Sequence, residues 1–187
     1  SEVNDNDAVR AGGGIEALEG TTALSGIKLN DNATGSAPGN GGGLHLTGAG
    51  TVATLLPGTM LFLGRPKQAP ARALLEAGAV VALATDFNPG TSPTVNFPLM
   101  LTLAVSQLRM SVAEAVLAAT VNGAAALGIA DQTGQIAPGM SADLALFEMD
   151  DIRELPYWYG DRRCRKTWVR GIACHGGDGD DTFSPSR

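Results

Sequence analysis

Two short apolar runs limit this chain to a small number of folds. They are residues 51–56 and 79–84, and the second shows no polar alternation at all. Residues 69–77 between them are good helix formers, and Gly78 follows as the expected C-terminal cap of a helix. Continuous apolar strands joined by a helix are typical of a parallel sheet that is covered on both faces. The sequence therefore predicts an α/β fold.

The other elements follow from local signals. Pro57 and Gly58 are expected to close the first strand with a turn. Ser111 and Glu114 have the spacing of a capping box, which predicts a helix that runs to about residue 127. Further helices are expected over residues 95–108 and 151–159, and strands over residues 142–147 and 166–172.

The first 48 residues differ from the rest in composition. They are rich in Gly, Asn, Ala, Thr and Ser, with glycine runs at 12–14 and 41–43. Such a segment buries too little apolar area to offset chain entropy, so residues 1–48 are interpreted as a disordered, low-complexity leader. A glycine-rich phosphate loop is the alternative, but no strand precedes these glycines and no Gly-Lys-Ser/Thr follows them.

Composition and charge exclude several classes of partner. The chain has 187 residues, a net charge of −6 and 17% charged residues. An acidic chain of this kind is a poor candidate for binding nucleic acid or an anionic membrane. Its two cysteines, Cys164 and Cys174, are too few for a disulfide scaffold and favour a reduced, cytoplasmic setting.

Asp86 is the first candidate for chemistry, because it directly follows the second apolar strand. Functional groups of parallel α/β proteins gather at the carboxyl ends of strands. A carboxylate there could bind a metal ion or take a proton from water. The residues alone leave a second reading open, in which Asp86 only caps a turn through its side chain.

Five segments carry a resemblance to a known family. Residues 85–90 read T-D-F-N-P-G, residues 50–58 end in L-L-P-G, and residues 120–128 read T-V-N-G-A-A-A-L-G. Residues 134–144 fit G-x-I-x-x-G-x-x-A-D-L, and residues 155–160 fit L-x-Y-x-x-G. Together they resemble the imidazolonepropionases of the amidohydrolase superfamily. The first segment is specific to the family, whereas the A-D-L segment marks only the superfamily.

The resemblance implies a fold and a division of the chain. We expect the C-terminal portion of a metal-dependent-hydrolase (β/α)₈ TIM barrel with part of a small β-sandwich domain. Residues 49–132 would be the last strands and helices of the barrel, residues 133–175 the segment of the β-domain, and residues 176–187 a polar tail.

The resemblance also implies an activity and the residues that carry it. The family hydrolyses a cyclic amide C–N bond in histidine catabolism, converting 4-imidazolone-5-propanoate and water to N-formimidoyl-L-glutamate. Asp86 matches the family's aspartate that ligates the catalytic metal, zinc or iron, and accepts the proton of the attacking water. Asn88 and Gly90 match positions that hold the product, and Thr91 matches one that touches the imidazolone substrate.

The chain departs from the family in its histidines. The family's His-x-His pair is missing, and the two histidines, His45 and His175, are interpreted as a loop residue and a residue of a frayed end. The remaining metal ligands are therefore absent from this chain. A complete barrel needs about 250 residues, so we expect an incomplete fragment that could be inactive alone. The family resemblance suggests a homodimer, and exposed apolar strands favour a complementing chain.

Two other readings remain at the level of the sequence. One is a different amidohydrolase, such as a deaminase or a dihydroorotase-like enzyme, although those lack the F-N-P-G that follows Asp86. The other is an inactive fragment that serves as an interaction module. The basic run 162–166 is interpreted as a solvated strand edge, with a phosphate site as the alternative.

Overall fold

The structure, a computed structural model, describes residues 16–17, 44–47, 52–66 and 68–175. The expected polar tail and most of the expected leader lie outside these ranges. Two short strands, β1 (Glu16–Ala17) and β2 (Leu44–Thr47), fall within the segment 1–48. His45 therefore lies in a strand, opposite Thr54, and its interpretation as a loop residue was wrong. The apolar–polar alternation of residues 44–47 has the period of a strand.

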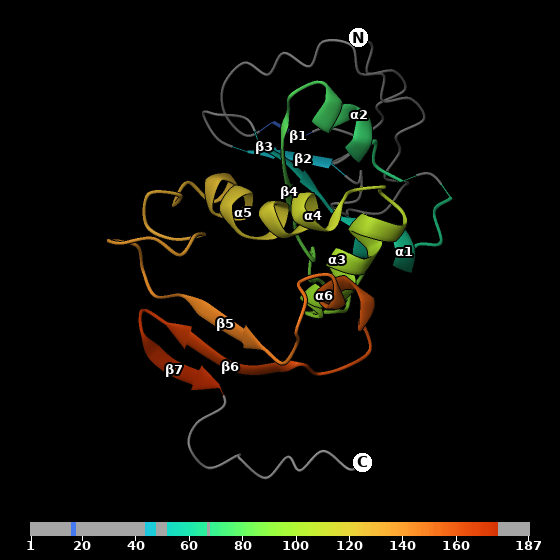
Figure 1. The fold of residues 1–187 in the computed structure, drawn as a ribbon. Helices are drawn as coiled ribbons and strands as arrows, with labels where there is room; N and C mark the ends of the chain where they lie inside the picture. The colour runs from blue at the N-terminus through green and yellow to red at the C-terminus, as the bar shows by residue number, and fades with distance from the viewer. Residues whose placement is uncertain (1–15, 18–43, 48–51, 67, 176–187) are drawn as a thin grey trace.

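A four-stranded sheet forms the upper body of the molecule (Figure 1), in the order β1-β2-β3-β4. The two predicted apolar strands are β3 (Val52–Leu55) and β4 (Val80–Leu83), and they pair in parallel as expected. Strand β2 pairs antiparallel to β3, so the sheet is mixed. The helix α2 (Ala71–Glu76) connects β3 to β4 and ends before Gly78, whose φ of +80° suits a C-terminal cap.

The helix α1 (Pro57–Phe62) stands where a turn was predicted. Proline fits the first turn of a helix because its missing N–H has no intrahelical partner there. Gly58 lets this helix pack closely, since a Cβ at that position would lie 2.9 Å from Cε of Met100 and 3.2 Å from Oγ of Ser92. The turn prediction was therefore wrong, and α1 carries the chain outward from the end of β3.

Three further helices follow β4. They are α3 (Phe97–Ser106), α4 (Val112–Ala119) and α5 (Val121–Ala126). Of these, α4 and α5 pack on the sheet and α3 packs against α4. The predicted helix to residue 127 is broken at Thr120, whose hydroxyl donates to the carbonyl of Val116 at 2.8 Å. The core lies between these helices and the two apolar strands, and its buried residues are Ala53, Leu55, Ala71, Leu74, Val81, Leu83, Leu101, Ala104, Leu108, Met110, Ala115 and Ala118.

The lower body is a three-stranded antiparallel sheet with the short helix α6 (Glu154–Tyr157) beside α3. Its strands are β5 (Leu144–Phe147), β6 (Cys164–Val169) and β7 (Ile172–His175). Residues 166–172, predicted as one strand, turn back at Arg170 and Gly171, which both have positive φ. The described residues show one sheet here and not the two layers of a sandwich, and the upper sheet is not a closed barrel.

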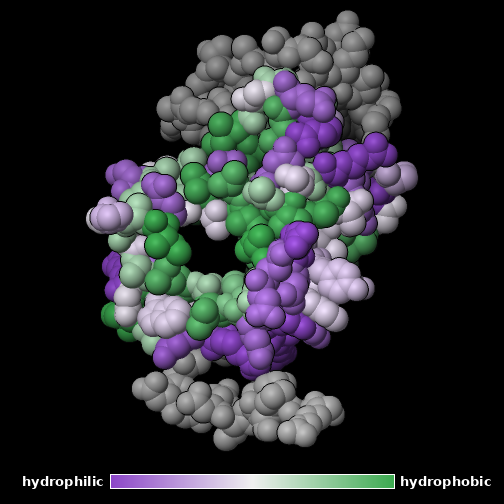
Figure 2. Space-filling view, viewed as in Figure 1, coloured by the Kyte–Doolittle hydropathy of each residue, from purple (hydrophilic) through white to green (hydrophobic). Residues whose placement is uncertain are grey.

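Apolar side chains line an opening between the two bodies (Figure 2). The two are joined at α3 and α6, where the hydroxyl of Thr102 donates to the carbonyl of Pro156 at 2.5 Å. Asp143 fixes the start of the lower sheet by accepting from the backbone N–H of Arg170 at 2.8 Å. The pKa of Asp143 is lowered chiefly by this bond and then by the hydroxyls of Thr133 and Ser141.

The capping box predicted at Ser111 and Glu114 is confirmed, and it includes a cation from another helix. Both oxygens of Glu114 accept from Arg72 of α2, at 2.8 and 3.0 Å. The hydrogen bond with Arg72, followed by that with the backbone N–H of Ser111, lowers the pKa of Glu114 to about 2. The cap of α4 is therefore tied to α2.

This arrangement predicts a stability that depends on pH. Because the folded-state pKa of Glu114 lies below its ordinary 4.5, its stabilisation is complete above pH 4.5 and is lost as pH falls toward 2. Urea midpoints of the natural chain and Glu114→Gln should differ most above pH 4.5 and converge below it. Asp151 also has a pKa of about 2, so the comparison between the two proteins isolates Glu114. A constant difference would contradict the prediction.

Candidate functional site

The carboxyl ends of β3 and β4 lie side by side, because the strands are parallel and Leu55 is in register with Leu83. Asp86 stands three residues beyond the end of β4, and Thr59 lies in the first turn of α1, just beyond β3. The hydroxyl of Thr59 donates to Oδ2 of Asp86 at 2.7 Å. The structure thus places a half-buried carboxylate at the strand mouth where the sequence predicted it.

The backbone of Asp86 has a left-handed conformation, with φ of +52°. Outside glycine this region is populated mainly by Asn and Asp, and it costs free energy. Two side chains of the following loop hold it. Nδ2 of Asn88 donates to the carbonyl of Asp86 at 2.6 Å, and Oγ of Ser92 donates to the carbonyl of Thr85 at 2.5 Å.

Asn88, Gly90 and Thr91, the three expected substrate-binding residues, are brought together in this loop. Oδ1 of Asn88 accepts from the backbone N–H groups of Gly90 and Thr91 at 2.9 and 2.8 Å. Its Nδ2 also lies 2.9 Å from the hydroxyl of Thr91. Backbone bonds between Asn88 and Ser92 close the loop at 3.1 and 3.3 Å. The side chain of Asn88 therefore organises the loop from inside.

We expect Asn88→Ala to lower the free energy of unfolding by about 2 kcal/mol, since it removes several hydrogen bonds each worth roughly 0.5–1.5 kcal/mol net. Asn88→Asp should cost less because its carboxylate still accepts from Gly90 and Thr91. Urea unfolding of both variants checks the order. Equal losses would show that the acceptor bonds to these two amides contribute little.

Metal-binding side chains do not gather within the part of the chain that the structure describes. It contains no group of three or more His, Cys, Asp or Glu residues placed to hold a metal ion. His175 ends β7, in the lower sheet, and both cysteines are free thiols in that sheet. Asp86 can supply one ligand, but these residues do not make a metal site.

No helix in the described ranges is long and apolar enough to cross a membrane.

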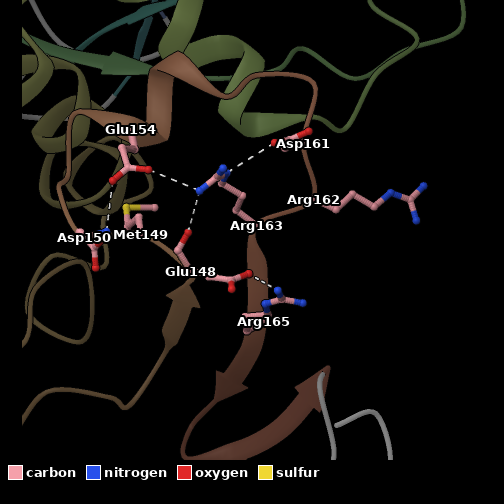
Figure 3. A pocket seen from close by; sticks show the side chains of 8 residues that line it. All are labelled: Glu148, Met149, Asp150, Glu154, Asp161, Arg162, Arg163 and Arg165. Atoms are coloured by element: carbon pink, nitrogen blue, oxygen red, sulfur yellow. Dashed lines mark hydrogen bonds and ion pairs between the residues drawn. The ribbon is translucent and has the colours of Figure 1, made fainter. Parts of the chain in front are cut away.

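The basic run 162–166 takes part in an ion-pair cluster beside α6 (Figure 3). The guanidinium of Arg163 lies 4.5 Å from the ring centre of Trp158 and donates to Oε2 of Glu154 at 3.3 Å. Its Nε is 3.5 Å from Asp161, close enough for an ion pair but without hydrogen-bond geometry. Arg165 pairs with Glu148.

These contacts line a cleft of about 790 Å³ in which acidic residues outnumber arginines. Arg162 points away from the other labelled side chains (Figure 3). The arrangement matches each inward arginine with a carboxylate, so it braces α6 against the lower sheet and gives no support to a phosphate site. The basic run is thus more than a solvated edge, because Arg163 is half-buried.

A second cleft, of about 550 Å³, lies between the residues that follow the Asp86 loop and the lower body. Its walls are mainly apolar and include Val95, Phe147, Leu155 and Trp158. It begins at Pro93, directly after Ser92. Neither of these two clefts is lined by Asp86.

Comparison with known families identifies the family to which this chain belongs. The sequence model described as the amidohydrolase family matches residues 9–174. The chain belongs to the amidohydrolase family. The match takes in most of residues 1–48, a segment in which the sequence motifs showed little resemblance to the family.

Curated relatives of this amidohydrolase chain are imidazolonepropionases. That of Rubrobacter xylanophilus is 51% identical over 110 residues, 59% of this chain and 26% of the relative. That of Solibacter usitatus is 42% identical over 154 residues, 82% of this chain and 33% of the relative. The chain thus spans about a third or less of these relatives.

Solved structures show the same fold. An adenosine deaminase from Xanthomonas campestris with bound zinc has a TM-score of 0.60 at 24% identity, covering 65% of this chain and 31% of the neighbour. The guanine deaminase of E. coli has a TM-score of 0.55 at 25% identity, covering 66% of this chain and 34% of the neighbour. Both support the amidohydrolase fold for the described part of the chain.

Thr59 and Ser92, which contact Asp86 and the residue before it, were not predicted from the sequence. Thr59 follows the carboxyl end of a parallel strand, which is the position that drew attention to Asp86. Extending the same rule to β3 would have singled it out. Ser92 lies in the loop already chosen, but only the fold shows that its hydroxyl reaches back to Thr85.

Proposed function

We propose that this chain carries the Asp86 loop of an imidazolonepropionase-type hydrolase, which uses water to open 4-imidazolone-5-propanoate to N-formimidoyl-L-glutamate. The observation that carries the proposal is the carboxylate of Asp86, held by Thr59 at the carboxyl ends of two parallel strands. The 41–51% identity to curated imidazolonepropionases supports the choice of substrate.

The proposed role of Asp86 is to accept a proton from the attacking water. The water oxygen forms a bond to the ring carbonyl carbon, the C–N bond breaks, and the proton passes to the leaving nitrogen. Amidohydrolases generally use a divalent metal, zinc or iron in this proposal, to activate such a water. In this proposal Asp86 is one ligand of such an ion, since the described residues hold no group of three or more His, Cys, Asp or Glu placed to bind a metal.

The proposed substrate contacts come from the loop that Asn88 organises. Gly90 is exposed and has no side chain, so a ligand can approach its backbone closely. Thr91 lies beside it and is half-buried. We assign the contact with the ring to Thr91 and contacts with the open-chain product to Gly90 and Asn88.

The edge strand β4 favours a role for a further segment or a second chain. The expectation of exposed apolar side chains was wrong for Val81, Ala82 and Leu83, which are buried. The support comes instead from the position of β4 as the last strand of the described sheet. A complementing chain, or a second copy in a homodimer, would supply the remaining ligands at this edge. An interaction module without catalysis is the alternative function. The free thiols of Cys164 and Cys174 suit a cytoplasmic location.

A chimera tests the catalytic proposal. The segment of this chain that aligns with the Rubrobacter xylanophilus enzyme replaces the matching segment of that enzyme, which retains its other residues. We expect the chimera to open the ring, seen as loss of imidazolone absorbance and formation of formimidoylglutamate. A folded chimera that does not turn over this substrate would overturn the proposal. The isolated chain should hold little tightly bound metal.

A further inference from the structure

Two fully buried hydroxyl groups converge on the Asp86 backbone and side chain. Thr59 and Ser92 are both 0% exposed and are the buried polar residues of the described core. A buried hydroxyl without a partner costs free energy, so the partners it finds matter. Thr59 donates to the carboxylate of Asp86, and Ser92 donates to the carbonyl of the preceding Thr85.

The two hydroxyl groups fix different parts of the same residue. The bond from Ser92 holds the Thr85–Asp86 peptide plane, and hence the positive φ of Asp86. The bond from Thr59 restricts rotation of the side chain by anchoring one carboxylate oxygen. A strained backbone at a functional residue persists only where its surroundings hold it in place.

The packing around these residues leaves little freedom. Ser92 lies against Gly58, where an added Cβ would approach Oγ to 3.2 Å. That same Cβ would be 2.9 Å from Cε of the fully buried Met100. Helix α1 and the loop 87–92 are thus pressed together at the point where Thr59 and Ser92 make their bonds.

We propose that Thr59 and Ser92 are positioning residues, which hold the carboxylate and backbone of Asp86 in the orientation used for hydrolysis. The inference rests on the proposed function only for the reaction in which Asp86 takes part. The orientation of Asp86 itself can be tested without substrate. Thr59 acts through the side chain of Asp86, and Ser92 acts through its backbone.

The test uses NMR of the full 187-residue chain. The carboxyl ¹³C resonance of Asp86 is compared in the natural chain, Thr59→Val, Thr59→Ser and Ser92→Ala. Thr102→Val is the matched control, because it also removes a hydroxyl bonded to a carbonyl, at Pro156. We expect the Asp86 resonance to shift in Thr59→Val and Ser92→Ala. In Thr59→Ser, which keeps the hydroxyl, and in the control, it should stay at the position seen in the natural chain.

An unchanged Asp86 resonance in Thr59→Val, or an equal shift in the control, would overturn the proposal. Should Thr59→Val not fold, Asp86→Gly removes the same bond from the other side, since glycine suits the positive φ at this position and has no side-chain acceptor. The hydroxyl and methyl resonances of Thr59 must then move, and unmoved Thr59 resonances count against the proposal. A failed ring-opening assay would overturn the proposed function and leave these measurements standing.

Discussion

Replacing Asp86 with asparagine is expected to lower the turnover of the chimera by about 1,000-fold, within the range for loss of a general base. Asparagine accepts a left-handed backbone, and its side-chain oxygen can still accept from Thr59. The fold should therefore survive while proton acceptance is lost. Ring-opening rates, together with circular dichroism of the variant, check both expectations.

The control for this substitution is Asp131→Asn, since Asp131 is exposed and lies in the connection after α5. It removes the same charge from the chain but should leave the rate within about twofold, as expected for a surface substitution. Comparable rates for Asp86→Asn and the natural chimera would show that another group accepts the proton.

Replacing Gly134 with alanine is expected to lower the free energy of unfolding by about 3 kcal/mol. Part of this loss of stability arises from the φ of Gly134, +100°, which L residues rarely adopt. The rest is steric, because an added Cβ would lie 2.7 Å from Cβ of Ala124 and 3.1 Å from the carbonyl of Thr120. These are short or rigid groups that cannot swing aside.

Gly139→Ala separates the two causes. Its φ of +87° imposes similar backbone strain, but nothing lies within 4 Å of an added Cβ. We expect a loss of about 1 kcal/mol from strain alone. Urea unfolding of both variants measures the difference, and equal losses would rule out the contact with Ala124 as a cause.

Elements with strong local signals were predictable from the sequence. The apolar runs became β3 and β4, and the capping box at Ser111 opened α4. Segments whose residues suit two conformations could not be predicted in this way. Pro57 and Gly58 suit either a turn or the start of a helix, and packing against Met100 decides for the helix. Likewise, Arg170 and Gly171 gave too weak a signal to reveal the hairpin.

The candidate site was predictable to the extent that it depends on position along one strand. Asp86 could be placed from the end of β4 alone. Its bond to Thr59 joins residues 27 positions apart, and it depends on the parallel register of β3 with β4. That register is set by the tertiary fold, so no local pattern could reveal the contact.

The left-handed backbone at Asp86 has a consequence for how such sequences diverge. Asn is at ease in that conformation, its side-chain oxygen can still accept from Thr59, and it is one nucleotide change from an aspartate codon. Drift to asparagine would preserve the loop's shape while deleting its acidic group. Selection that retains aspartate at this position would therefore act on its acidic group, because folding alone would also permit asparagine.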